Sequence, residues 1–479
     1  MSLSIEQQRA SAAVQTHLIG VCGAGMKALA EYLVSAGARV TGSDLSTDSR
    51  TATTLRSQGV ELYAGHAASH LPPQCRRVVH SAAIPADNPE RVAARAANLP
   101  LISYPKFIAE LSRMRQTIGI AGTHGKSTTT AAIASLLSAS GPAPDVLCGA
   151  EVIDTGRNGW SGDSRRLVVE CCEYRRHFLD VAINTLLLTG IEWDHVDSFA
   201  SLNDTLDAFV RLLRHIPQQG RVIYNGDCRS SRRAIAAARI EHCCAGPQVV
   251  SVGWGPDNDW RITDCTEMGW GSTFDLVGPN DRLGTFVTRL PGRHNVSNLA
   301  LAAVGAFVLN APASDILRAV ERFSGVWRRL QQLGEWRGMT LIDDYAHHPT
   351  AVQAVLNTVH RAYPKRFVRI VFQPHQAQRT IAMSGDFCRA LSLADSVTVL
   401  PAFAAREVDS QLAETTSRNL VDSLRKLGRP ARFIASLDHV LPTLETEGRP
   451  GDVVLLAGAG SIERVADEFT FRLCRNHAG

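Results

Sequence analysis

Short apolar runs recur along the chain, and longer segments with helix-like spacing of apolar residues separate them. Strands are predicted at 17–21, 38–44, 76–84, 117–121, 167–170, 185–191, 338–344, 367–373, 396–400 and 452–458. Continuous apolar runs are typical of parallel strands buried on both faces, which need long crossover connections. The pattern therefore predicts an α/β protein whose parallel sheets are covered by helices.

Three domains are expected, since 479 residues exceed the length of one ordinary domain. We predict a Rossmann-like N-terminal domain at 16–106, a central P-loop-type ATPase sheet at 107–323 and a Rossmann-like C-terminal domain at 324–479. Residues 253–290 are rich in Gly, Trp, Asp and Thr and predict a small antiparallel insert. An alanine-rich helix is expected at 299–309, before Pro312.

Composition narrows the class of protein. A hydrophobic content of 45% with 20% charged residues is typical of a globular protein, and the net charge of +4 is too small to indicate nucleic-acid binding. The polar N-terminus lacks a secretory leader, and no apolar run approaches the ~18 residues of a membrane span. Eleven cysteines include adjacent pairs at 171–172 and 243–244 but no C-x-x-C, which favours reduced thiols. We expect a cytoplasmic protein, monomeric or homodimeric, with no membrane or nucleic-acid partner.

The stretch G-T-H-G-K-S-T-T-T at 122–130 follows an apolar strand and leads into a helix-compatible run. Such a turn places backbone N–H groups and a helix N-terminus around an anion. Lys126 offers charge for the β- and γ-phosphates of a nucleotide, and Ser127 offers a hydroxyl for Mg²⁺. Ile120 stands where the strict P-loop pattern needs glycine, so a chance glycine-rich turn is the alternative. The preferred prediction is binding of ATP or GTP.

A second glycine turn, G-V-C-G-A-G-M at 20–26, lies between the first strand and a helix. Cys22 replaces the second glycine of a dinucleotide fingerprint, but the turn could still hold a diphosphate, and Asp44 ends the next strand where an acid commonly meets a ribose. A tight turn without ligand is the alternative. Two such turns suggest two nucleotide-bearing ligands.

Polar residues end three further strands. Glu170 ends the strand at 167–170, and His195 follows the strand at 185–191. We predict that Glu170 and Ser127 serve one Mg²⁺ and that His195 serves a second. A structural histidine and a capping glutamate are the alternatives. The run D-D-Y-A-H-H-P at 343–349 contains two acids, a tyrosine and two histidines, which favours a functional site. A strand-end turn stopped by proline is the alternative.

Several blocks together resemble one family, the Mur ligases, which are ATP-dependent amide-bond ligases of peptidoglycan and cell-wall synthesis. The resemblance covers nearly the whole chain from Thr16. Its blocks are H-L-I-G-V-C-G-A-G-M, G-S-D-L, A-G-T-H-G-K-S-T-T-T, E-W-D-H-V-D, P-G-R-H-N-V-S-N, F-S-G-V-W-R-R-L, I-D-D-Y-A-H-H-P-T, V-F-Q-P-H and L-P-A-F-A-A-R-E.

The resemblance implies a site residue by residue. UDP-N-acetylmuramate would bind Gly20, Gly23, Ala24, Gly25, Met26, Asp44 and Ser81. ATP would bind Gly122, Thr123, Gly125, Lys126, Ser127, Thr128, His294, Asn295, Asn298, Arg329 and Asp344, with Mg²⁺ on Ser127, Glu170 and His195. Lys126, His195, His347 and Arg379 would be catalytic, with Tyr345 facing the reacting groups. ATP would phosphorylate the muramoyl carboxylate, and the amine of L-alanine would displace phosphate from the acyl phosphate.

Some positions depart from the family pattern. Cys22 resembles a cysteine of relatives that reattach a recycled tripeptide, Arg175 stands where an acid is usual, and Gln376 replaces an arginine. Gly190 stands where the family usually has the residues T-N. Val210 stands where sister ligases carry a carbamylated lysine, and the absence of that lysine is expected for the alanine-adding branch.

Three hypotheses follow. The chain adds L-alanine to UDP-N-acetylmuramate, or it attaches a recycled murein tripeptide to the same substrate. In the third, it is a nucleotide-binding scaffold without catalysis. R-E-V at 406–408 and H-H-P favour the first.

Overall fold

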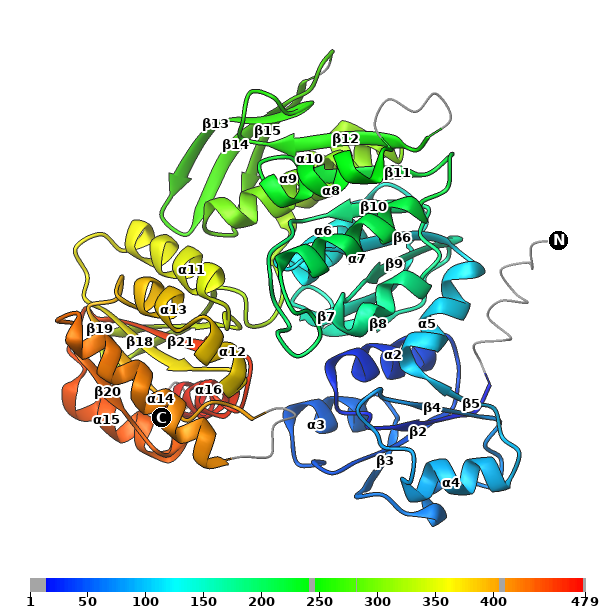
Figure 1. The fold of residues 1–479 in the computed structure, drawn as a ribbon, viewed down its shortest axis with the longest axis horizontal. Helices are drawn as coiled ribbons and strands as arrows, with labels where there is room; N and C mark the ends of the chain where they lie inside the picture. Colours follow the sequence, from blue (N-terminus) through cyan, green and yellow to red (C-terminus); the bar gives the residue numbers. More distant parts are fainter. Residues whose placement is uncertain (1–13, 241–245, 281, 405–409, 477–479) are drawn as a thin grey trace.

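The computed structural model describes residues 14–240, 246–280, 282–404 and 410–476. The three predicted α/β segments form three separate sheets in sequence order (Figure 1). Every strand predicted from the apolar runs overlaps an observed strand. No helix among these residues has the length and apolar character that a membrane span requires. Cys243 and Cys244, together with the segment at 405–409 that contains R-E-V, lie outside the described residues.

The N-terminal sheet is fully parallel, with strand order β3-β2-β1-β4-β5, as the Rossmann-like prediction requires. Its strands are β1 (Thr16–Ile19), β2 (Val40–Asp44), β3 (Glu61–Ala64), β4 (Arg77–His80) and β5 (Leu101–Ser103). Its helices are α2 (Ala24–Ser35), α3 (Arg50–Ser57), η1 (Ala68–His70), α4 (Pro89–Ala96) and α5 (Tyr104–Arg113). Helix α5 runs through the proposed domain boundary at residue 106, so that boundary stays a prediction.

The central sheet has the order β15-β14-β13-β12-β11-β10-β6-β9-β7-β8. Its strands are β6 (Gln116–Ala121), β7 (Asp145–Val152), β8 (Arg157–Trp160), β9 (Arg166–Glu170), β10 (Thr185–Leu188), β11 (Arg221–Asn225), β12 (Gln248–Gly253), β13 (Trp260–Met268), β14 (Gly271–Val277) and β15 (Arg282–Thr288). Its helices are α6 (Lys126–Ala139), η2 (Tyr174–Asp180), α7 (Leu202–Arg214), α8 (Arg229–Ala238), α9 (Arg293–Val308) and α10 (Ala313–Arg322).

Strand β10 shows why the central strands are apolar throughout. Leu186 and Leu188 enter the core shared with α7 and the N-terminal domain, whereas Leu187 enters the core formed with α6 and α9. Successive side chains of a strand point to opposite faces, and here both faces are buried.

The antiparallel insert predicted at 253–290 is confirmed, because β14 pairs antiparallel with both β13 and β15. Strand β13 also pairs in parallel with β12, so the insert extends the central sheet. Another predicted element needs correction. The alanine-rich helix begins at Arg293 rather than near residue 299. The polar start of this helix hid it from an apolar pattern, and the change places the whole H-N-V-S-N block on α9.

The C-terminal sheet has the order β16-β17-β21-β18-β19-β20 and is parallel except for the edge strand β16. Its strands are β16 (Gln331–Trp336), β17 (Met339–Asp344), β18 (Val368–Gln373), β19 (Ser396–Val399), β20 (Ala431–Phe433) and β21 (Val453–Gly458). Its helices are α11 (Pro349–Ala362), α12 (Ala377–Ala382), α13 (Ser384–Leu391), α14 (Ser410–Lys426), η3 (Leu437–His439), α15 (Val440–Glu447) and α16 (Glu463–Asn476).

The N-terminal and central domains are joined tightly. Helix α2 packs on β7 and β8, so closely that a Cβ atom at Gly159 would overlap the carbonyl oxygen of Ala28. Glu151 accepts from Lys27 at 2.8 Å and from Arg50 at 2.7 Å across this interface. The C-terminal domain lies beside the central domain at the lower left of Figure 1 and reaches it through α11 and α12.

Candidate active site

The predicted phosphate loop has the expected form, a turn between β6 and the N-terminus of α6. Gly125 caps α6 with a left-handed backbone (φ 76°), and a Cβ atom there would overlap Oδ1 of Asn298 on α9. Thr123 fixes the loop from the other side, because its hydroxyl accepts from Glu192 N (2.9 Å) and donates to Glu192 O (3.1 Å). The loop is therefore held open at a helix N-terminus, which suits an anion.

Gly125→Ala should disturb this loop. The left-handed backbone and the overlap with Asn298 are expected to lower the free energy of unfolding by about 1–3 kcal/mol and to weaken ATP binding. Gly141→Ala is the control, since no atom lies within 4 Å of its Cβ position, and it should change stability by less than about 0.5 kcal/mol. Denaturant titration and ATP-binding calorimetry measure both variants, and equal behaviour of the two would contradict the expectation.

Lys126 points back into the loop and pairs with a residue that the sequence reasoning missed. Its Nζ donates to Gly122 O at 2.5 Å and forms an ion pair with Glu173 at 2.9 Å. Burial alone would lower the pKa of Lys126, but the carboxylate of Glu173 outweighs burial and raises it. Lys126 is thus a fixed positive charge at the loop. The sequence could have indicated Glu173, because it lies in the run E-C-C-E at 170–173, three residues after the end of β9.

Of the three predicted metal ligands, His195 lies in a cluster with two residues that were not predicted. His195 Nε2 lies 3.7 Å from Glu173 Oε1, and Cys172, Glu173 and His195 have potential ligand atoms within 4.8 Å of one another. Glu170 instead accepts from Gly149 N at 2.8 Å. Among the described acids, Glu173 is therefore the one that the structure pairs with both Lys126 and His195. Ser127 lies buried in the first turn of α6.

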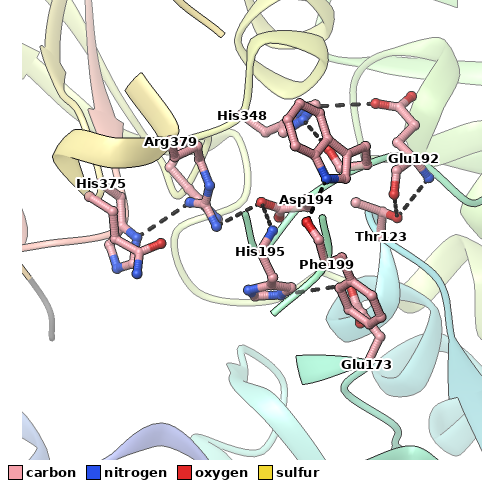
Figure 2. Close-up of polar contacts among 12 residues, drawn as sticks. Thr123, Glu173, Glu192, Asp194, His195, Phe199, His348, His375 and Arg379 are labelled. Atoms are coloured by element: carbon pink, nitrogen blue, oxygen red, sulfur yellow. Dashed lines mark hydrogen bonds and ion pairs between the residues drawn. The ribbon is translucent and has the colours of Figure 1, made fainter. Parts of the chain in front are cut away.

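The loop after β10 connects the phosphate loop to the C-terminal domain (Figure 2). Asp194 forms a buried ion pair with Arg379 at 2.7 Å, and Nη1 of Arg379 lies 3.3 Å from Nδ1 of His375. Burial alone would raise the pKa of Asp194, but the guanidinium of Arg379 holds it well below its usual range. The next residue, His195, has φ 52°, so its side chain turns away toward Glu173. Residues 194 and 195 therefore face opposite ways, Asp194 toward Arg379 of the C-terminal domain and His195 toward Glu173 beside the phosphate loop.

His347 lies close to Arg379 in the turn before α11, with Tyr345 on its other side. The rings of His347 and His375 lie 5.4 Å apart, and those of His347 and Tyr345 lie 5.3 Å apart. Burial and the charge of Arg379 lower the pKa of His347 well below its ordinary value, so this imidazole is neutral at neutral pH.

The predicted ATP residues outside the phosphate loop and α6 lie on α9, at the end of β17 and, for Arg329, just before β16. Asn298 contacts the phosphate loop, whereas Asn295 donates its side-chain amide to Pro291 O at 2.8 Å and braces the start of α9. Burial lowers the pKa of His294 to about 4. Asp344 accepts from two backbone amides, Leu330 N and Ala346 N, both at 2.7 Å, and so shapes the turn beside Arg329.

The predicted UDP turn gathers at the carboxyl edge of the N-terminal sheet. Gly20 and Gly23 lead from β1 into α2, which begins at Ala24 and includes Gly25 and the buried Met26. Asp44, at the end of β2, accepts from Cys22 N at 2.9 Å, so its carboxylate holds the turn. Ser81 follows β4 and donates its N–H to Ile19 O at 2.9 Å.

The positions that depart from the family pattern are spread over the three domains. Gln376 is buried at the start of α12, three residues before Arg379. Arg175 has φ 51° and lies over the ring of Tyr174. Gly190 O accepts from Thr123 N at 2.8 Å, so Gly190 supports the phosphate loop.

Comparison with known proteins decides the family. The family models of the Mur ligase catalytic domain, middle domain and glutamate ligase domain match residues 15–116, 120–306 and 328–460 in that order. A UDP-N-acetylmuramate--L-alanine ligase of Nitratidesulfovibrio vulgaris is 34% identical over 95% of this chain and 97% of its own.

The chain belongs to the Mur ligase family. A Rhizobium etli protein of the same name as the Nitratidesulfovibrio relative is 36% identical, covering 93% of this chain and 94% of its own. Among solved structures, the UDP-N-acetylmuramate-alanine ligase of Thermotoga maritima superposes with a TM-score of 0.79 at 25% identity, covering 96% of this chain and 99% of that one. A murein peptide ligase of Psychrobacter arcticus, 22% identical over 95% of this chain and 98% of its own with a TM-score of 0.72, shares the Mur ligase fold.

Proposed function

We propose that this Mur ligase joins L-alanine to the carboxylate of UDP-N-acetylmuramate, with conversion of ATP to ADP and phosphate. The observation that carries the proposal is a chain of contacts between two domains. Lys126 pairs with Glu173, Glu173 lies beside His195, and the neighbouring Asp194 pairs with Arg379 of the C-terminal domain. Relatives named for the same reaction match along nearly the whole chain, which favours it over tripeptide attachment and over a scaffold without catalysis.

Lys126 would neutralise charge as the γ-phosphoryl group of ATP passes to the muramoyl carboxylate. The loop around it fits phosphates, because the absent Cβ of Gly125 and the N-terminus of α6 leave backbone donors facing an anion. Ser127, Glu170 and Glu173 supply the oxygen donors that Mg²⁺ prefers, with the imidazole of His195 as one further donor, and Mg²⁺ would offset phosphate charge when bound.

Arg379 would orient the incoming amino acid. Its side chain is 1% exposed, and its buried Nε has no hydrogen-bond partner among the described residues, so one donor of this planar fork is unsatisfied. A carboxylate of L-alanine matches that donor. His347, neutral and close to Arg379, could accept the proton that the amine loses as it attacks the acyl phosphate.

Oxygen transfer tests the activated-carboxylate route. With UDP-N-acetylmuramate labelled by ¹⁸O in its carboxylate, ATP and L-alanine, the phosphate released should carry one ¹⁸O, because the acyl oxygen bridging to phosphorus leaves with it. Mass spectrometry of phosphate and of the alanylated product gives the answer. Unlabelled phosphate accompanied by product would contradict an acyl phosphate, and absence of product would contradict the ligase.

A further inference from the structure

Three side chains beside the phosphate loop form a cluster that the ligase mechanism does not use. We propose that His124, Glu192 and His348 bind a transition-metal cation of the Zn²⁺ class. Their potential ligand atoms lie within 4.8 Å of one another. The proposal is independent of the substrate assignment above.

The spacing of the cluster fits a tetrahedral ion. His124 Nε2 and His348 Nδ1 lie 3.3 Å and 3.7 Å from the same oxygen, Oε2 of Glu192. Bonds of about 2.0–2.1 Å in tetrahedral zinc sites place neighbouring ligand atoms about 3.3 Å apart. Binding would therefore require only small side-chain adjustments.

The backbone that carries the cluster is fixed. Thr123 holds Glu192 by two hydrogen bonds, and Thr189 Oγ1 donates to His124 O at 2.5 Å. His348 Nε2 lies 3.3 Å from Trp193 O (Figure 2). Since a carbonyl oxygen only accepts, Nε2 carries the proton and Nδ1 is an acceptor. Nδ1 receives the N–H of Thr350 at 3.4 Å, and a bound ion would take the place of this long hydrogen bond. A metal-binding histidine commonly has this arrangement, with its other N–H donated to a carbonyl group.

Charge and exposure also suit a metal ligand set. Burial and the nearby His124 lower the pKa of His348 to about 4, so its imidazole is neutral. Burial opposes ionisation of Glu192, but His124 and Thr350 hold its pKa at about 2. The side chains of His124 and Glu192 are 33% and 40% exposed, which leaves a solvent-facing position for a water ligand.

Two imidazoles and one carboxylate select the class of ion. Such a set suits Zn²⁺, Co²⁺ or Ni²⁺, whereas Mg²⁺ prefers an octahedron of oxygen ligands. Because His348 comes from the C-terminal domain and the other two ligands from the central domain, a bound ion would tie the phosphate loop to the C-terminal domain.

Cobalt spectroscopy tests the site directly. Untagged full-length protein, with millimolar Mg²⁺ to fill the oxygen-rich site, is titrated with Co²⁺ and then with Zn²⁺. We expect visible absorption typical of tetrahedral Co²⁺, saturating at one ion per chain and displaced by Zn²⁺. His124→Gln and Glu192→Gln should each weaken Co²⁺ binding at least about 100-fold, because loss of a mere outer-shell partner already costs 10–100-fold.

Two control variants locate the ion. His360→Gln removes a histidine elsewhere on α11, and Cys172→Ser alters the other cluster of potential ligands, formed with Glu173 and His195. Both should bind Co²⁺ as the unmodified protein does. Absence of the absorption in the unmodified protein, its survival in folded His124→Gln and Glu192→Gln, or its loss in Cys172→Ser alone would each overturn the proposal. Circular dichroism establishes folding, and either His124→Gln or Glu192→Gln suffices if the other unfolds.

Discussion

Lys126→Ala is expected to lower kcat at least about 10³-fold while UDP-N-acetylmuramate still binds. Removal of one charge-stabilising donor commonly costs 10²–10³-fold, and here the lysine is the fixed cation of the phosphate loop. The substitution also leaves Glu173 buried without its partner, which sets a second negative charge against the phosphates. Phosphate release measures turnover, and calorimetry measures binding of the UDP substrate.

Lys106→Ala is the matched control, because Lys106 is exposed on α5 and belongs to no proposed site. It should retain normal activity. A Lys126→Ala enzyme with near-normal turnover would refute the phosphate role of this lysine, whatever the behaviour of the control.

Arg379→Ala is expected to lower kcat/KM about 100-fold or more and to loosen the C-terminal domain. The pair with Asp194 is buried, and removal of one partner of such a pair typically costs about 3–5 kcal/mol, with about 1.4 kcal/mol for each tenfold change in rate. Small-angle X-ray scattering should then show a larger radius of gyration, because Asp194 no longer holds α12.

Arg379→Lys and Arg389→Ala complete this test. Lysine keeps the charge but not the planar fork, so it should restore compactness better than activity. Arg389 is 75% exposed on the neighbouring helix α13, and its replacement should change neither quantity. Unchanged scattering and kinetics in Arg379→Ala would contradict the proposed role of the pair.

The fold was largely predictable because its central strands are continuous apolar runs. Strand β10 is the clearest case, since both of its faces are buried and its pattern needs no partner to be recognised. The start of α9 was not predictable in this way, because polar residues of the H-N-V-S-N block occupy its first turns. The sequence of β13–β15, at one end of the central sheet, alternates only weakly, so the attachment of these strands to the sheet depends on tertiary pairing.

The candidate site was predictable where a motif is local. Lys126 follows from its strand–turn–helix setting, and His195 from its place after β10. Glu173 and Asp194 were missed as functional residues, because their roles arise from pairs with Lys126 and Arg379, far away in the sequence. The packing of the three domains decides which carboxylate pairs with which cation. The spacing of apolar residues along the chain does not predict these pairs.

The acceptor dependence of phosphate release tests the central proposal most directly. Purified protein with ATP, Mg²⁺ and UDP-N-acetylmuramate is supplied in turn with L-alanine, L-serine, glycine or murein tripeptide. L-alanine should give the highest kcat/KM, with about 10-fold or more discrimination against glycine, which lacks one methyl group. Phosphate release with the tripeptide alone, or with none of the four acceptors, would contradict assignment as an alanine-adding ligase.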